Sequence, residues 1–257
     1  MKHFYLLDED PRYRLLGDML WDAGYRVSFS LEKEEEAAFY FFSLGAGEEK
    51  IRPVLEDAKK GSFAFIGKNI PTLSPLAKEK NIVLCPALED EIYLLKNAKA
   101  TAEGVLKHVI ESCPRTLSEL TVLVYGFGNC GSEIARLLWL CGCEVFITSR
   151  ERGSRAATKE GFNVFPAEKK GLSMFDAVIN TVPDPIFSPS LLETLGAGSH
   201  FFQVASGLSG IDPDSLSSRG VLFHPLPRLP GRYAPLSEAQ ALYDLISRTM
   251  ETNRSKQ

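Results

Sequence analysis

An apolar run that leads through three closely spaced glycines into a helical pattern limits the chain to few folds, and it lies at residues 122–150. Val122–Tyr125 is predicted to be a buried strand, because uninterrupted apolar runs are typical of parallel sheets covered on both faces. Beyond the glycines, apolar residues recur on one helical face, at Ile134, Leu137, Leu138 and Cys141. Gly142 is suited to end that helix, and Val145–Ile147 is the next predicted strand. The segment is therefore predicted to form the first strand, helix and strand of a Rossmann-type doubly wound sheet.

The turn between that strand and helix has the pattern of a loop that binds a dinucleotide, and its candidate cofactor-binding residues are Gly126, Phe127, Gly128, Asn129 and Gly131. Gly126 permits a tight turn, Gly128 lets the backbone approach a pyrophosphate, and Gly131 lets the helix pack closely on the strand. The amides and the positive dipole end of the helix then face the anion. The alternative is an ordinary structural turn, since glycine also serves turns that bind nothing.

The end of the second strand predicts which nicotinamide cofactor is bound. NAD enzymes usually place an Asp or Glu there, which binds the ribose 2′-hydroxyl. This chain instead has Ser149, Arg150 and Arg152, and a planar guanidinium suits a 2′-phosphate. We therefore expect NADP rather than NAD, with NAD kept open because Glu151 lies between the arginines. The alternative is that Arg150 and Arg152 are solvated surface charges.

Composition excludes several classes of protein. The chain has 257 residues, 44% of them hydrophobic, so it can bury a substantial core. Its net charge of -4 and pI near 5.7 argue against nucleic acid as a partner. No apolar run reaches the roughly 20 residues of a membrane helix, and Met1–Phe4 leads into a strand instead of a secretion signal, so we expect a cytoplasmic protein. The five cysteines lack a C-x-x-C pair and the four histidines do not cluster, so no metal site is expected.

The chain is predicted to be a two-lobed α/β protein. Residues 1–100 are expected to form a smaller flavodoxin-like or Rossmann-like substrate lobe with a parallel sheet, and its predicted strands are 4–7, 26–30, 39–42, 63–66 and 82–84. A linking helix is expected at 101–116, with Thr101 as its N-cap and Glu103 in its first turn. Residues 117–232 are expected to form the Rossmann domain, with further strands at 163–165, 177–180, 201–205 and 221–224. A C-terminal helix at 233–257 is expected to return to the first lobe, and the acidic run Glu32–Glu36 is expected to be a solvated turn or helix start.

Several short segments resemble one family, the A subunit of dipicolinate synthase, over nearly the full length of the chain. The segments are Asp10-Pro11-Arg12, NAKATAEG at 97–104, VLVYGFGNCG at 122–131, INTVP at 179–183, VAS at 204–206 and LPGRYAP at 229–235. The TAEG and LPG..AP pieces are the specific ones. The glycine loop and INTVP are shared with many nicotinamide-dependent enzymes, including shikimate and 2-hydroxyacid dehydrogenases.

The resemblance implies a function in the synthesis of dipicolinic acid during sporulation. A cyclic hydroxy-tetrahydrodipicolinate of the lysine pathway, or its dihydro form, would be oxidised to dipicolinate with a nicotinamide cofactor as acceptor. A flavoprotein-like B subunit would be the partner, and a homo-oligomer is compatible with the fold.

The resemblance also suggests roles for individual residues. Arg12 and Arg232 would bind the substrate carboxylates, because a guanidinium can hold a carboxylate bidentately. Thr101, Glu103 and His224 are the candidate catalytic residues near an expected cleft between the lobes, although helix capping already explains the first two. Further cofactor contacts are expected from the segments INTVP and VAS, at Asn180, Thr181, Val182, Pro183 and Ala205.

The chain departs from the family pattern in two places. The family segment D.AS.PGG.D corresponds to residues 203–212, where the first Asp is replaced by Gln203 and the Pro-Gly pair is missing. The family segment AP.TAG corresponds to residues 234–239, where the terminal glycine is replaced by Ala239. These changes keep two alternatives open. The chain is either a divergent synthase subunit or a relative with a changed task. Such a relative would be another NADP-dependent small-acid dehydrogenase or a noncatalytic NADP-binding subunit that regulates or scaffolds a partner.

Overall fold

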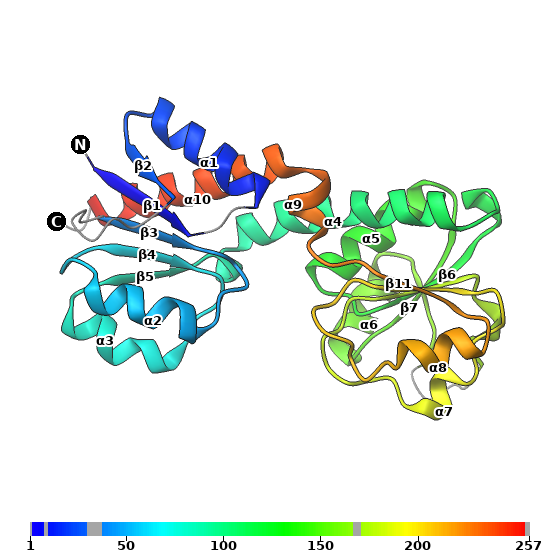
Figure 1. Cartoon of the computed structure of the whole chain (residues 1–257). Coiled ribbons are helices and arrows are strands. Elements are labelled where there is room, and N and C mark those ends of the chain that lie inside the picture. The colour runs from blue at the N-terminus through cyan, green and yellow to red at the C-terminus, as the bar shows by residue number, and fades with distance from the viewer. Residues whose placement is uncertain (1, 8–9, 30–37, 167–170, 255–257) are drawn as a thin grey trace. The chain divides into compact units, whose positions relative to one another are not determined.

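The computed structural model of the chain describes residues 2–7, 10–29, 38–166 and 171–254. The chain divides into two compact units, residues 1–97 with 234–257, and residues 98–233. Figure 1 shows the elements of both units coloured along the chain. The acidic run Glu32–Glu36 lies outside the described residues.

The N-terminal unit is built on a five-stranded parallel sheet. Its strands are β1 (His3–Leu7), β2 (Arg26–Ser28), β3 (Phe39–Phe42), β4 (Phe63–Ile66) and β5 (Val83–Pro86), in the order β2-β1-β3-β4-β5. All neighbouring strands pair in parallel. This order is that of flavodoxin-like sheets. The central strands are buried on both faces, which is why the apolar runs of the sequence, such as Phe39–Phe42, do not alternate with polar residues.

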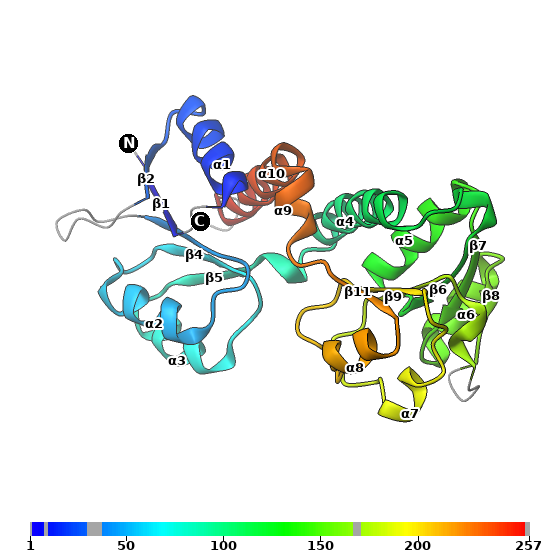
Figure 2. The same ribbon diagram turned by 45° about the vertical axis from the view of Figure 1, so that its right-hand side comes forward.

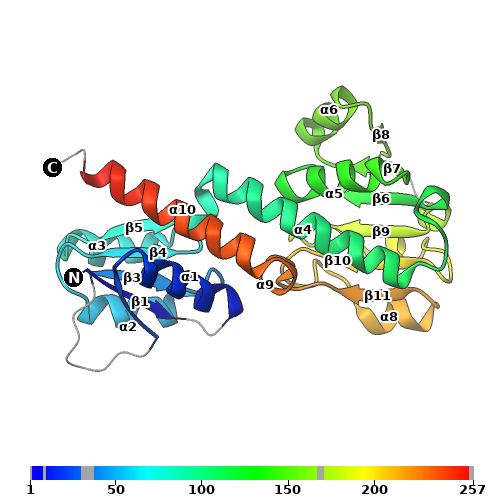
Figure 3. The ribbon, with the colours of Figure 1, turned by 90° about the horizontal axis from the view of Figure 1, so that it is seen from above.

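Helices cover both faces of this sheet. On one face α1 (Pro11–Asp22) and α10 (Pro235–Arg254) pack beside each other and bury one aromatic-rich core cluster (Figures 1 and 3). On the other face lie α2 (Glu48–Asp57) and α3 (Ser74–Glu79), over a second cluster of buried residues. Short 3-10 turns, η1 (Pro71–Leu73) and η2 (Ala87–Glu89), connect the later elements. The C-terminal helix thus completes the core of the unit in which the chain begins.

The prediction that the linking helix at 101–116 begins at Thr101 is wrong. The helix α4 runs from Glu91 to Ser112, and Asp90 caps it, since the Asp90 side chain accepts a hydrogen bond from the Tyr93 backbone amide at 2.7 Å. Thr101 therefore lies in the middle of the helix and is not its N-cap, and Glu103 is not in its first turn. The residues between Asp90 and Thr101 are mostly good helix formers, so the helix extends across them.

The C-terminal unit contains a six-stranded sheet in the order β11-β10-β9-β6-β7-β8. Its strands are β6 (Thr121–Tyr125), β7 (Glu144–Thr148), β8 (Asn163–Val164), β9 (Ala177–Asn180), β10 (His200–Gln203) and β11 (Leu222–Pro225), and all pairs are parallel. Numbered within the unit, this is the Rossmann order 3-2-1-4-5-6 read backwards. The strand order reverses between β6 and β9, which is the position at which such sheets bind ligands.

The helices of this unit also lie on two faces. The residues of α4 beyond position 97, α5 (Asn129–Leu140) and α6 (Glu151–Lys159) share one core cluster with the sheet, and α7 (Pro189–Leu192) and α8 (Pro213–Ser218) share another (Figure 2). The remaining short elements are α9 (Leu229–Tyr233), η3 (Leu117–Glu119) and η4 (Leu172–Met174). Together the two units confirm the predicted two-lobed α/β fold with a Rossmann-type sheet. Within the described residues, no helix combines the length and apolar character needed to span a bilayer.

Candidate functional site

The glycine loop lies at the point where the strand order of the Rossmann sheet reverses. β6 ends at Tyr125, and Gly126 follows with φ of +95°, a conformation that side chains rarely adopt. The Gly126 amide donates to the Thr148 carbonyl oxygen at 2.8 Å, which ties the loop to the end of β7. Directly after β9, the Thr181 hydroxyl donates to the Tyr125 carbonyl oxygen at 2.7 Å. The loop is thus anchored to both strands that flank it.

Two of the three glycines are required by close packing. A Cβ added at Gly126 would lie 2.5 Å from the Thr181 hydroxyl oxygen, and one added at Gly131 would collide with the Gly126 carbonyl oxygen. Helix α5 therefore approaches the end of β6 closely, as the sequence pattern predicts. Glycine at these positions is needed to build the loop itself.

Gly128 differs, because the space where its side chain would lie is open. Apart from its two chain neighbours, no heavy atom of the described residues comes within 4 Å of a Cβ built on Gly128. Gly128 is the N-cap of α5, and no side chain caps that end of the helix. The first-turn amides of a helix have no partners within it, so the start of α5 offers donors and a positive dipole end toward the open side of Gly128. A pyrophosphate fits this arrangement.

The residues expected to select the cofactor lie directly after β7. Arg150 is the N-cap residue of α6 and its side chain is 86% exposed, while Arg152 is exposed in the first turn. Arg150 forms an ion pair with the carboxylate of Asp184, at 2.5 Å. A solvent-exposed pair of this kind contributes at most about 1 kcal/mol, so a phosphate can compete for the guanidinium. Ser149 packs on Gly153, where a Cβ would collide with its hydroxyl.

Asn180, a predicted cofactor contact, lies in a buried hydrogen-bond network at the end of β9. Its side chain is fully buried, and its amide nitrogen donates to the Val182 carbonyl oxygen and to Gln203 Oε1, both at 3.0 Å. The Asn180 Oδ1 accepts from the Val182 amide at 2.9 Å. These bonds use both amide hydrogens, so the Asn180 side chain holds the loop after β9 in place. Thr181, Val182 and Pro183 remain at least partly exposed beside the glycine loop.

Gln203, which replaces an Asp of the family pattern, is the centre of the neighbouring turn. Its amide nitrogen donates to the Gly207 carbonyl oxygen at 2.9 Å and to the Ser209 hydroxyl at 3.0 Å, and the side chain is 3% exposed. The Ser209 hydroxyl in turn donates to the Val182 carbonyl oxygen at 2.8 Å. Ala205, a predicted cofactor contact, is half-buried in this turn. Gln203 thus forms a hydrogen-bonded scaffold at the position where the family pattern has Asp.

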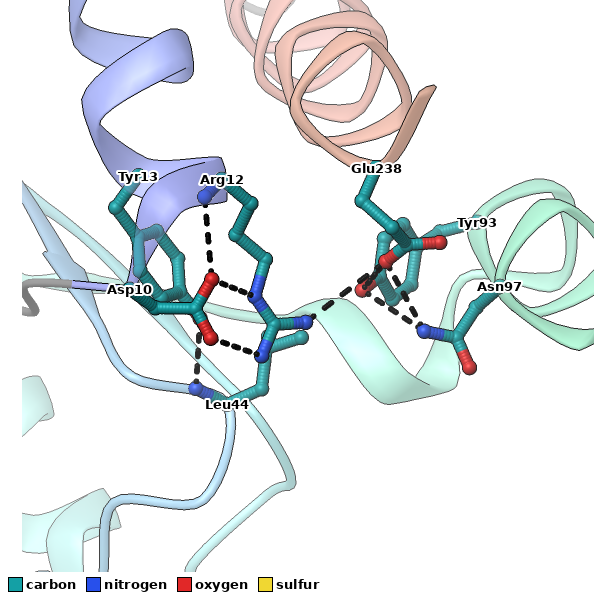
Figure 4. A network of polar contacts seen from close by, with 7 residues as sticks. All are labelled: Asp10, Arg12, Tyr13, Leu44, Tyr93, Asn97 and Glu238. Atoms are coloured by element: carbon teal, nitrogen blue, oxygen red, sulfur yellow. Dashed lines mark hydrogen bonds and ion pairs between the residues drawn. The ribbon is translucent and has the colours of Figure 1, made fainter. Parts of the chain in front are cut away.

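Arg12, a candidate carboxylate-binding residue, lies in a buried polar network of the N-terminal unit (Figure 4). It is 7% exposed, and its guanidinium contacts the carboxylate of Asp10, which also caps α1. Glu238 on α10 lies at its other end, with 3.9 Å between Arg12 Nη1 and Glu238 Oε2. Glu238 stands where the family segment AP.TAG has an alanine, but only the packing of α10 on α1 brings it to Arg12.

Arg232, the other candidate, is exposed at the end of α9, with its guanidinium 5.3 Å from the centre of the Tyr233 ring. Tyr233 is also hydrogen-bonded to His108, with 2.7 Å between its hydroxyl and His108 Nε2. Arg12 and Arg232 belong to different units of the chain.

The candidate catalytic residues have different environments. Thr101 is buried at 5% exposure within α4, and Glu103 is exposed on the same helix. His224 lies in β11, where its Nε2 is 3.0 Å from His200 Nδ1 and the two rings stack. Burial lowers the pKa of His224, and His200 and His108 lower it further, which favours the neutral imidazole. The pairing with His200, which sequence reasoning missed, gives His224 a structural partner.

Comparison with known proteins places the fold first in a class. NAD-dependent formate dehydrogenase from Staphylococcus aureus, solved in complex with NAD, superposes with a TM-score of 0.62 at 14% identity over 98% of this chain and 95% of that one. No protein-family model matches the chain. The chain therefore has the two-unit fold of nicotinamide-dependent dehydrogenases.

Within that class the chain is similar to the A subunit of dipicolinate synthase. The A subunit from Bacillus subtilis (strain 168) is 26% identical over 189 residues, which make up 72% of this chain and 64% of the relative, so the match spans somewhat less than two thirds of the relative's length. The crystal structure of the corresponding subunit from Bacillus halodurans superposes with a TM-score of 0.81 at 20% identity, over 96% of this chain and 97% of that one. These similarities confirm the resemblance to the dipicolinate synthase family that the motifs predicted.

Proposed function

We propose that the chain is an oxidoreductase that binds a nicotinamide dinucleotide on the glycine loop of its C-terminal unit. The observation that carries the proposal is the open space at Gly128, at the uncapped start of α5 and at the reversal point of the sheet. A Rossmann sheet binds dinucleotides at this point. When bound, the nicotinamide ring accepts or gives a hydride.

The substrate is proposed from the resemblance to the A subunit of dipicolinate synthase. The reaction is the oxidation of a lysine-pathway hydroxy-tetrahydrodipicolinate or dihydrodipicolinate to dipicolinate. Arg12 is the carboxylate-binding residue proposed for the N-terminal unit, and Arg232 the one proposed for the C-terminal unit. Glu103, exposed on α4, and Thr101 and His224 remain the candidates for holding or moving a proton.

NADP is the proposed cofactor, with NAD as the alternative. Support comes from Arg150 and Arg152, which lie directly after β7, where NAD enzymes usually have a carboxylate. Asp184 competes for Arg150, but their ion pair is exposed on both sides. The remaining proposed contacts are Phe127, Asn129, Ser149, Thr181, Val182, Pro183 and Ala205.

The proposed partner subunit and the proposed location in the cell also follow from the resemblance. The relative's name implies that a second subunit exists, and the partner proposed for this chain is a flavoprotein-like B subunit. Dipicolinate production would place the protein in the cytoplasm of a sporulating cell.

A coupled assay tests the proposal directly. The lysine-pathway intermediate is supplied with NADP or NAD, with and without the B subunit, and dipicolinate is followed by its ultraviolet absorbance. The proposal predicts dipicolinate formation that depends on the added nicotinamide cofactor. Cofactor-dependent turnover of a hydroxy or keto acid, without dipicolinate formation, would instead indicate another small-acid dehydrogenase.

A noncatalytic NADP-binding subunit is the second candidate function. The observation that favours it is Gln203, whose amide is fully engaged in holding the turn at 204–209. The family pattern has a carboxylate at this position, and a scaffold amide cannot replace its charge. This candidate predicts tight cofactor binding with no turnover of any acid, whether or not the B subunit is present.

A further inference from the structure

The Arg12 guanidinium is held along one edge by Asp10. The Arg12 Nη2 donates to Asp10 Oδ2 at 3.2 Å, and Nε lies 3.2 Å from Asp10 Oδ1 (Figure 4). The same carboxylate accepts from the Arg12 backbone amide at 3.1 Å, so capping of α1 fixes where it lies. Asp10 lies along the Nε–Nη2 edge, with a hydrogen bond at Nη2 and an ion-pair contact without hydrogen-bond geometry at Nε, so the Nη1–Nη2 edge is the fork that a carboxylate ligand would use.

Glu238 lies next to that second edge. Its Oε2 accepts from the Tyr93 hydroxyl at 2.9 Å and from the Asn97 amide nitrogen at 3.1 Å, and lies 3.9 Å from Arg12 Nη1. The Arg12–Glu238 distance is longer than a hydrogen bond, so Glu238 lies near the Nη1–Nη2 edge of Arg12 without forming a hydrogen bond to it. Glu238 is 1% exposed and Tyr93 is fully buried, so little water screens the charges there.

The count of charges decides whether this fork attracts an anion. With Asp10 and Glu238 both ionised, one cation lies between two carboxylates, and the cluster carries a net charge of -1. A further carboxylate at the Nη1–Nη2 edge would then lie near Glu238, and like charges at such separation repel strongly in a buried site. If Glu238 is protonated, the cluster is neutral and the ligand carboxylate makes it an anion of the same net charge as before.

We propose that Glu238 controls the carboxylate-binding fork of Arg12, so that a ligand carboxylate binds there together with one proton, which Glu238 takes up from solvent. This inference rests on the proposed function, in which Arg12 binds a substrate carboxylate. The proton from solvent forms the O–H bond of Glu238, and no other covalent bond forms or breaks.

The environment of Glu238 supports proton uptake. Burial raises the pKa of Glu238 above its usual range, while hydrogen bonds from Asn97 and Tyr93 and the charge of Arg12 oppose the rise. Among the described residues, the titratable or charged groups that act on it are Asp10, the N-cap of α1, Arg12 in the first turn of α1, and Tyr93 from α4. A second carboxylate at the fork would raise this pKa further, which is the linkage that makes binding take up a proton.

Titration calorimetry with dipicolinate as the probe tests the inference. The wild-type protein should bind dipicolinate about tenfold more weakly for each pH unit above the pKa of Glu238, and should take up close to one proton, read from buffers of different ionisation enthalpy. Glu238→Gln removes the charge and keeps an acceptor for Tyr93, so its binding should vary little with pH and be tighter than that of the wild type at every pH at which wild-type binding has weakened.

Two further variants give matched comparisons. Tyr93→Phe removes a hydrogen bond that lowers the pKa of Glu238. In this variant, dipicolinate binding should therefore begin to weaken at a higher pH than in the wild-type protein. Asp244→Asn removes a carboxylate from the same helix, where Asp244 pairs with Lys96 at 2.6 Å, and should bind dipicolinate as wild type does. These variants also keep the test independent of whether Glu238→Gln alone is stable.

The outcomes separate this inference from the proposed function. If Arg12→Ala weakens dipicolinate binding but Glu238→Gln keeps wild-type pH dependence, the role of Glu238 is overturned and that of Arg12 stands. If Arg12→Ala binds dipicolinate as wild type does, or wild type does not bind it, the substrate assignment fails and the inference fails with it. A Glu238→Gln protein that binds more weakly than wild type at every pH would show a positioning role and overturn the proton linkage.

Discussion

Replacing Gly128 with alanine should separate cofactor binding from folding. Its φ is -91°, which alanine adopts readily, and apart from the two chain neighbours no heavy atom of the described residues lies within 4 Å of the added Cβ. Alanine is a poorer N-cap than glycine by about 0.5 kcal/mol, whereas the loss of backbone freedom in the unfolded chain offsets about the same amount. The free energy of unfolding should therefore change by less than about 0.5 kcal/mol.

Cofactor affinity should fall, because the new methyl group occupies the space in which a pyrophosphate would approach the backbone. Loss of one hydrogen bond to a charged phosphate costs about 2 kcal/mol, which corresponds to about a 30-fold rise in the dissociation constant. The affinity is measured by NADPH fluorescence titration, and stability by urea denaturation.

Gly45→Ala is the matched control. Gly45 lies in the N-terminal unit, has no positive φ, and also has no heavy atom within 4 Å of an added Cβ. Its variant should bind NADPH as wild type does. Unchanged NADPH affinity in Gly128→Ala would refute the placement of the pyrophosphate, and a large loss of stability would show that the open space is filled.

The other predictions concern charge and buried polar groups. Arg150→Ala should weaken NADP binding about tenfold and leave NAD binding and stability nearly unchanged. Asp184→Asn should strengthen NADP binding slightly, because it frees the Arg150 guanidinium. If titrations show equal effects on NADP and NAD affinity, a contact with the 2′-phosphate is ruled out. Asn180→Ala should cost about 2–3 kcal/mol in urea denaturation, because it leaves buried partners unsatisfied, and a loss below about 0.5 kcal/mol would contradict its scaffold role. Burial lowers the pKa of His200 and His224, so the free energy of unfolding should fall as pH drops below about 6.5, the unfolded value, and level off below the folded pKa. His224→Gln should reduce the dependence of the free energy of unfolding on pH in this range, and an unchanged pH dependence would contradict the burial of the His200–His224 pair.

The Rossmann segment could be predicted from sequence because its requirements are local. The glycines at 126 and 131 are needed by contacts within a few residues or with the adjacent strand, and apolar runs such as Ala177–Asn180 specify buried parallel strands by themselves. Strand ends differ from the predictions by only one or two residues, as at β10, which begins at His200.

The features that the sequence did not predict depend on the folded chain and cannot be read from a local sequence pattern. Asp90 and Thr101 are both suitable N-caps, and only the folded helix shows that Asp90 is used. The polar roles of Asn180 and Gln203 depend on a turn that brings strands β9 and β10 together. Glu238 reaches Arg12 through the packing of the last helix on the first, and no local signal indicates such a contact.

A crystal structure of the protein with NADPH tests the central claim most directly. We predict the pyrophosphate within hydrogen-bond distance of the backbone amides at the start of α5, above Gly128, and the 2′-phosphate beside Arg150 or Arg152. A dinucleotide bound away from residues 126–131, or a loop that stays free of ligand at saturating NADPH and NADH, would contradict it.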